Sequence, residues 1–123
     1  MRTTARIVAI VEDDPAMRKS LERLLRVNGY TTTALSSAED FLQSGVGDHA
    51  AALILDIHLS GMSGIELRRR LLAAGSQLPV IFITAYEDQA IRAEAHATGC
   101  LDFLTKPFET SQLMDALERC MNP

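Results

Sequence analysis

Polar residues of three chemical kinds stand at the ends of the apolar segments of this chain: carboxylates, one hydroxyl and one ammonium group. Carboxylates that converge repel one another, and a divalent cation relieves that repulsion. Oxygen ligands without a cluster of His or Cys favour Mg²⁺, which keeps water molecules and shares phosphate oxygens. The residues concerned are Glu12, Asp13 and Asp14 after the first segment, Asp56 in the third, Thr84 in the fourth, and Lys106 before Pro107 after the fifth.

This combination predicts a metal-dependent site that accepts a phosphoryl group. In such chemistry a carboxylate attacks the phosphorus atom, and positioning and charge neutralisation supply most of the catalysis. Asp56 is the candidate acceptor, with Lys106 and Thr84 holding the phosphate oxygens. Asp14 beside Pro15 is interpreted as a helix N-cap instead.

Five segments rich in apolar and β-prone residues alternate with helical segments and would bring these groups together. Three of the five are nearly continuously apolar, which is typical of parallel strands covered on both faces. The pattern predicts an α/β fold: a (βα)5 chain with a doubly wound, five-stranded parallel sheet in the order 2-1-3-4-5. Ligands of such sheets bind outside the carboxyl ends of the strands. The segments are 7–11, 30–35 at an edge, 52–57, 79–84 and 101–105.

The helical segments have recognisable ends. Ser36 with Glu39, and Ser63 with Glu66, have the spacing of capping boxes. The segment 87–98 is rich in alanine and has one large aliphatic residue, so it is expected to bury little surface on the sheet.

Several stretches carry a resemblance to a known family: VEDD at 11–14, LILDI at 53–57, GMSGIEL at 61–67, FITA at 82–85 and DFLTKPF at 102–108. Over essentially the whole chain the sequence resembles the receiver domain of two-component response regulators, and their FixJ-type branch in particular. The resemblance implies a flavodoxin-like, CheY-like fold. It also implies one receiver (response regulatory) domain over residues 1–123, with no output domain in this chain.

The resemblance implies a role for each acidic residue of the site. Asp56 matches the aspartate that a partner histidine kinase phosphorylates. Glu12 and Asp13 match the acids that bind Mg²⁺, for which Mn²⁺ can substitute. The backbone carbonyl of His58 would complete the metal site together with Asp56.

The remaining site residues also match family positions. Thr84 and Lys106 match the hydroxyl and the ammonium that contact the phosphoryl group, and Lys106-Pro107 is expected to be a cis peptide. Phe103 matches the aromatic switch residue that acts with Thr84. His58 and Tyr86 would form the rim of the path of the hydrolytic water, and we expect this bulky pair to slow loss of the phosphoryl group.

The resulting expectation is a phosphoprotein switch in signal transduction that catalyses only its own phosphorylation and dephosphorylation. Phosphorylation would move Thr84, turn Phe103 inward and shift the surface formed by the fourth helix, fifth strand and fifth helix. That surface would control an output domain or downstream protein, with transcription as the expected process. A phosphorylation-dependent homodimer is expected on the same surface.

Two positions depart from the family pattern. Glu12 stands where Asp is also common, and Ser60 stands where many receivers have proline in the loop after the phosphorylated aspartate. Without that proline, the loop 57–63 is expected to be more mobile.

Composition narrows the class of protein further. The 123 residues carry a net charge of -4, which argues against direct binding of nucleic acid. Cys100 and Cys120 are too few for a disulfide framework and are expected to fill apolar space. Neither a signal peptide nor a membrane span is recognised, so a cytoplasmic location is expected. The basic residues of the first helix, a candidate kinase-docking element, and Arg68 to Arg70 are expected to be solvated.

Two other classes of function compete with the switch. A metal-dependent phosphatase could turn over a small substrate through phosphorylated Asp56, but no second acid stands two residues after it. A flavodoxin-like cofactor binder would need a phosphate-binding loop after the first strand, where three acids stand instead. Whether the chain is a natural single-domain receiver or the first part of a longer regulator stays open.

Overall fold

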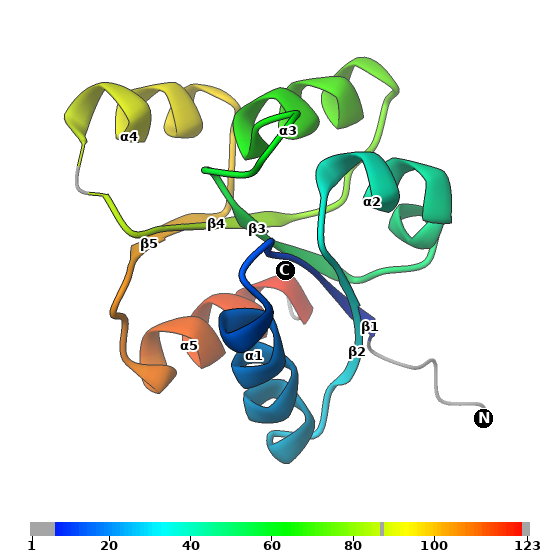
Figure 1. Ribbon diagram of the computed structural model, residues 1–123, viewed down its shortest axis with the longest axis vertical. Helices are drawn as coiled ribbons and strands as arrows, with labels where there is room; N and C mark the ends of the chain where they lie inside the picture. The colour runs from blue at the N-terminus through cyan, green and yellow to red at the C-terminus, as the bar shows by residue number, and fades with distance from the viewer. Residues whose placement is uncertain (1–6, 87, 122–123) are drawn as a thin grey trace.

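The computed structural model describes residues 7–86 and 88–121, in which a parallel five-stranded sheet lies between two layers of helices (Figure 1). The strand order is β2-β1-β3-β4-β5, as predicted. The strands are β1 (Ile7–Val11), β2 (Thr31–Leu35), β3 (Ala52–Asp56), β4 (Val80–Thr84) and β5 (Asp102–Thr105). The helices are α1 (Pro15–Val27), α2 (Ala38–Ser44), α3 (Gly64–Ala73), α4 (Gln89–Ala97) and α5 (Thr110–Met121), with a short 3-10 turn η1 (Val46–Asp48) after α2.

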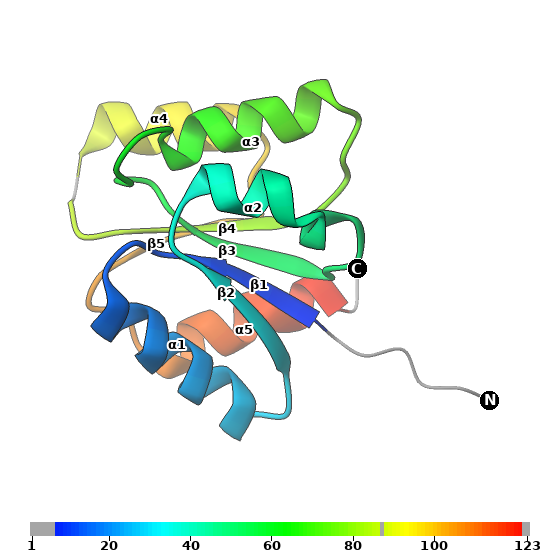
Figure 2. The same cartoon turned by 45° about the vertical axis from the view of Figure 1, so that its right-hand side comes forward.

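The two faces of the sheet are covered by different numbers of helices. In Figure 2, α1 and α5 lie on one face, and α2, α3 and α4 lie on the other. Every residue of β3 and β4 is buried, which explains their continuous apolar runs, whereas β2 is a partly exposed edge strand. No helix among the described residues is long and apolar enough to cross a membrane.

The predicted start of α1 is confirmed, and that of α2 is off by one residue. Asp14 caps α1, since its carboxylate accepts a hydrogen bond from the Ala16 N–H at 3.3 Å. The N-cap of α2 is Ser37 instead of Ser36, and its Oγ accepts from the Asp40 N–H at 3.0 Å. The shift leaves the Glu39 carboxylate free of the cap and able to reach another part of the chain.

The cap of α3 agrees with the prediction in part. Ser63 Oγ accepts a hydrogen bond from the Glu66 N–H at 3.1 Å, as in a capping box. The Glu66 carboxylate, however, pairs with Arg70 one turn further along the helix at 3.2 Å. An exposed ion pair therefore replaces the second half of the predicted box.

The helix α4 is loosely packed, as its composition predicts. It begins after the N-cap residue Asp88, and Ala95 is its only buried residue. The predicted start at Glu87 lies outside the described residues.

Arg68 corrects the expectation that the basic run on α3 is solvated. Its side chain is buried, and it donates to the carbonyl oxygens of Leu78 at 3.0 Å and Gly99 at 3.2 Å. The guanidinium thus joins the segments that lead into β4 and β5. Arg69 and Arg70 are exposed, as expected.

Candidate functional site

Four neighbouring strands bring the predicted site residues to one end of the sheet. Strands β1, β3, β4 and β5 are consecutive and parallel, so the segments that follow them leave the sheet at the same edge. Oxygen atoms of Glu12, Asp13 and Asp56 lie within 4.8 Å of one another there. The Lys106 N–H donates to the Thr84 carbonyl at 2.7 Å, which fixes the end of β5 beside β4.

Lys106 joins two of the three carboxylates. Its Nζ lies 2.8 Å from Glu12 Oε1 and 3.2 Å from Asp56 Oδ2. Both carboxylates are buried, with exposed fractions of 1% for Glu12 and 5% for Asp56. The peptide bond after Lys106 is cis, as expected.

Burial and charge act in opposite directions on this cluster. Burial raises the pKa of Glu12, and the hydrogen bond from Lys106 offsets part of that rise. Burial by itself would lower the pKa of Lys106, but the hydrogen bonds and charges of Glu12 and Asp56 outweigh it and raise that pKa. Lys106 is therefore held as a cation between the two acids.

Backbone groups fix the carboxylates further. Glu12 Oε2 accepts from the Asp14 N–H at 3.1 Å, and the Arg18 guanidinium donates to the Glu12 carbonyl at 2.9 Å. Asp56 Oδ1 accepts from the His58 N–H at 3.0 Å. The bonds from the Asp14 and His58 N–H groups orient the carboxylates before any ligand binds, and the bond from Arg18 holds the Glu12 backbone.

The donor set fits a hard divalent cation. Three carboxylates face one ammonium group, so negative charge remains in excess, and the ligand atoms are oxygens within a span that one ion can bridge. Glu12, Asp13 and Asp56 are the residues that would hold it. The participation of the His58 carbonyl stays a prediction.

Thr84 and the aromatic Phe103 lie on the neighbouring strands β4 and β5. Thr84 is buried, and its Oγ1 accepts from the Tyr86 N–H at 3.2 Å. Phe103 is 5% exposed, with the Arg92 guanidinium 4.6 Å from its ring centroid and the His96 ring at 6.0 Å. Phe103 is therefore buried against α4, and its inward turn on phosphorylation stays a prediction.

The exposed side chains of His58 and Tyr86 touch one another. Their ring centroids lie 4.8 Å apart in an edge-to-face arrangement. The contact joins the segment after β3 to the segment after β4, and Tyr86 is 62% exposed.

Two contacts at the loop 57–63 were not predicted. Ser60 donates to Asp13, and the Met62 N–H donates to Glu39 Oε2 at 2.9 Å. The sequence contained one signal for the Ser60 contact: a serine in place of proline adds a backbone and a side-chain hydrogen-bond donor. The expected mobility of this loop is opposed by these bonds.

Both cysteines are free and partly buried, as expected of apolar filler. Burial raises the pKa of Cys100, and it raises the pKa of Cys120 to about 11. Neither thiol therefore has the lowered pKa that marks a reactive cysteine.

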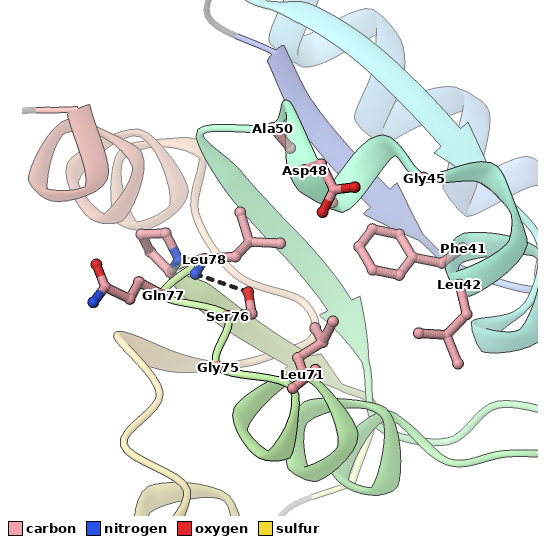
Figure 3. A pocket seen from close by; sticks show the side chains of 13 residues that line it. Phe41, Leu42, Gly45, Asp48, Ala50, Leu71, Gly75, Ser76, Gln77 and Leu78 are labelled. Carbon is pink, nitrogen blue, oxygen red and sulfur yellow. Dashed lines mark hydrogen bonds between the residues drawn. The ribbon is translucent and has the colours of Figure 1, made fainter.

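A hollow of about 600 Å³ lies at the other end of the sheet, beside α2 and the segment that leads into β4 (Figure 3). Apolar side chains of Phe41, Leu71 and Leu78 line it, and Ser76 Oγ accepts from the Leu78 N–H at 3.2 Å at its edge. No residue of the acidic cluster lines this hollow. The candidate site is therefore the charged edge of the sheet, by which we mean the carboxyl ends of the strands where Glu12, Asp13, Asp56 and Lys106 meet.

The fold and the sequence together define the class of protein. Residues 8–118 match the family model of the response regulator receiver domain, and the chain belongs to this family of two-component signalling proteins. Membership favours the switch over the phosphatase and the cofactor binder.

Particular relatives and structures agree with this class. The chain is 40% identical over 115 residues to nodulation protein W of Bradyrhizobium diazoefficiens, covering 94% of this chain and 51% of that protein. It is 35% identical over 116 residues to the transcriptional regulatory protein FixJ of the same organism, covering 94% and 57%. The structure of FixJ-N superposes with a TM-score of 0.86 at 36% identity, covering 98% of this chain and 94% of that one. The chain thus spans about half the length of the curated relatives it matches.

Proposed function

We propose that this chain is a phospho-acceptor switch in which Asp56 receives a phosphoryl group from a histidine kinase in a Mg²⁺-dependent reaction. The observation that carries the proposal is the meeting of Glu12, Asp13, Asp56 and Lys106 at the carboxyl ends of adjacent strands. Family membership supports the same reading.

Each residue of the site has a separate role in phosphoryl transfer. A carboxylate oxygen of Asp56 forms a bond to phosphorus while the bond to the nitrogen of the donor histidine breaks. Bound Mg²⁺ would neutralise charge on the phosphoryl oxygens. Lys106, held 3.2 Å from Asp56, and the hydroxyl of Thr84 would contact the same oxygens. Because these groups are positioned beforehand, little reorganisation accompanies the transfer.

The phosphorylated state would be read at the surface formed by α4, β5 and α5. Thr84 pairs with Thr105 of β5, two residues after the buried Phe103, and Arg92 of the loosely packed α4 donates to Thr105 Oγ1, so a shift of Thr84 has a short path to that surface. The relatives include proteins named as transcriptional regulators, which supports control of an output domain or downstream protein in transcription. A phosphorylation-dependent homodimer on this surface belongs to the same proposal.

Intact-protein mass after incubation with acetyl phosphate tests the proposal. We expect one phosphoryl adduct that requires Mg²⁺, appears in the wild type and in Asp48→Asn, and is absent from Asp56→Asn. Asp48 is the control because it lies at the distant hollow. An adduct on Asp56→Asn, or one that forms equally after chelation of Mg²⁺, would contradict the assignment.

A further inference from the structure

Ser60 contacts a proposed metal ligand from a distant part of the chain. Its backbone N–H lies 3.2 Å and its Oγ lies 3.3 Å from the same atom, Asp13 Oδ2. Asp13 follows β1, whereas Ser60 lies between β3 and α3. The two bonds therefore join the two segments that supply the acidic cluster.

The loop that carries Ser60 is anchored on its other side. Glu39 of α2 accepts from the Met62 N–H, and that hydrogen bond lowers the pKa of the Glu39 carboxyl. Gly61, between Ser60 and Met62, has a φ of +79°, and a Cβ atom there would lie 2.8 Å from Glu39 Oε2. The backbone that positions Ser60 beside Asp13 is thus held to α2 by the hydrogen bond from Met62 to Glu39.

We infer that Ser60 is a positioning residue for the metal site: its two donors hold one carboxylate oxygen of Asp13, so that the other oxygen is oriented as a ligand. The inference rests on the proposed function, in which Glu12, Asp13 and Asp56 bind Mg²⁺. Partners that hydrogen-bond to a ligating carboxylate fix its orientation and so raise metal affinity. A proline at this position could supply neither donor.

The geometry favours orientation over competition. A carboxylate has two oxygens with about four acceptor positions. Both Ser60 donors use Oδ2, which leaves Oδ1 of Asp13 for a cation. If the donors instead competed with the ion, removing them would tighten Mg²⁺ binding.

Mg²⁺ titration of the whole chain by calorimetry provides that test. Ser60→Ala removes the hydroxyl donor and keeps the N–H, so we expect Mg²⁺ binding to weaken about tenfold, the lower end of the effect of losing such a partner. Ser60→Thr keeps both donors and is expected to bind like the wild type. Ser76→Ala removes a serine hydroxyl at the distant hollow and serves as the matched control.

Each outcome decides the inference. Unchanged affinity in Ser60→Ala, tighter binding in that variant, or weakening in Ser60→Thr equal to that of Ser60→Ala would each overturn the positioning role. Urea unfolding without Mg²⁺ should give similar midpoints for the wild type, Ser60→Ala and Ser60→Thr, because the hydrogen bond from the Ser60 hydroxyl to Asp13 is exposed. A wild type that binds no Mg²⁺ would overturn the metal part of the proposed function itself, and the inference with it.

Discussion

At the scale of single residues, the charged edge of the sheet is organised around Lys106, which contacts Glu12 and Asp56. Replacing Lys106 with Met keeps the aliphatic stem and leaves the two buried carboxylates without their cation. Because the Lys106 side chain is partly exposed, we expect Lys106→Met to lower the free energy of unfolding by about 3 kcal/mol at neutral pH without Mg²⁺, the lower end for breaking a buried ion pair. Urea unfolding measures it.

The matched control for this prediction is an exposed ion pair. Arg69 lies 2.8 Å from Glu94, with both side chains largely in solvent. Arg69→Met should cost less than about 1 kcal/mol, because water screens the pair. Equal effects of the two substitutions would show that burial adds nothing to the Lys106 contacts.

The paired rings of His58 and Tyr86 concern the lifetime of the phosphoryl group. Replacing both with Ala opens the rim that we expect to border the path of the hydrolytic water. We predict an about tenfold shorter lifetime, equivalent to ~1.4 kcal/mol of barrier. Intact-protein mass is followed over time after the phosphodonor is removed.

The control for the rim is Leu72→Ala, which trims an exposed apolar side chain on α3 away from the site. Its phosphoryl lifetime should equal that of the wild type. An unchanged lifetime in the double variant would refute the proposed role of the pair.

Cys120 gives a pH-dependent prediction. Because burial raises its pKa from 9.0 to about 11, its thiolate fraction at pH 8 should be about 100-fold lower than in the unfolded chain. Folding also retains the proton that the unfolded chain loses, so this group lowers stability as pH rises from 9 towards 11.

Thiol titration with a disulfide reagent in a Cys100→Ser background checks the Cys120 prediction. The rate should keep rising above pH 9 in the folded protein, while in urea it should level off near that pH. Levelling near pH 9 in the folded protein would mean that Cys120 has an ordinary pKa.

At the scale of elements, the junction of β3 and α3 depends on Gly64. A Cβ atom there would lie 2.3 Å from the Asp56 carbonyl oxygen, so the backbone that carries Asp56 would have to move. We expect Gly64→Ala to destabilise the protein by about 2–3 kcal/mol and to slow phosphorylation of Asp56. Urea unfolding and the acetyl phosphate reaction measure the two effects.

Substitution of Gly75 is the control that distinguishes backbone strain from a steric clash of the added Cβ atom. Its φ is +83° and a Cβ atom there would meet nothing within 4 Å. Gly75→Ala should cost about 1–2 kcal/mol through backbone strain alone and leave the phosphorylation rate unchanged. A slower reaction in this control would mean that lost stability, and not the Gly64 contact, explains the effect.

At the scale of the whole molecule, signalling requires that a change at Asp56 reach a distant surface. The helix α4 buries only Ala95, whereas α1 anchors itself through Leu21 and Leu25. We predict that phosphorylation changes amide hydrogen exchange in residues 84–104 at least about threefold, with little change in α1, since weakly packed elements open most readily. Exchange followed by mass spectrometry tests this, and unchanged protection in 84–104 would refute it.

Much of the architecture follows from local patterns in the sequence. Continuous apolar runs identify β3 and β4, because a strand covered on both faces needs no polar side. Parallel strands then place the carboxylates and Lys106 at one edge, so the membership of the site could be predicted from chain order.

The sequence by itself determined the class of fold and the residues that gather at the charged edge, since these depend on hydrophobic periodicity and chain direction, and the strand order followed from the right-handed crossovers of parallel sheets. Only the tertiary structure decided the burial of Arg68 and Phe103 and the bonds from Ser60 to Asp13. Each of these last features depends on which donors and acceptors from separate segments come within bonding distance, or on how side chains pack against neighbouring elements. Short-range pattern does not specify such meetings, because they arise when the helices dock on the sheet.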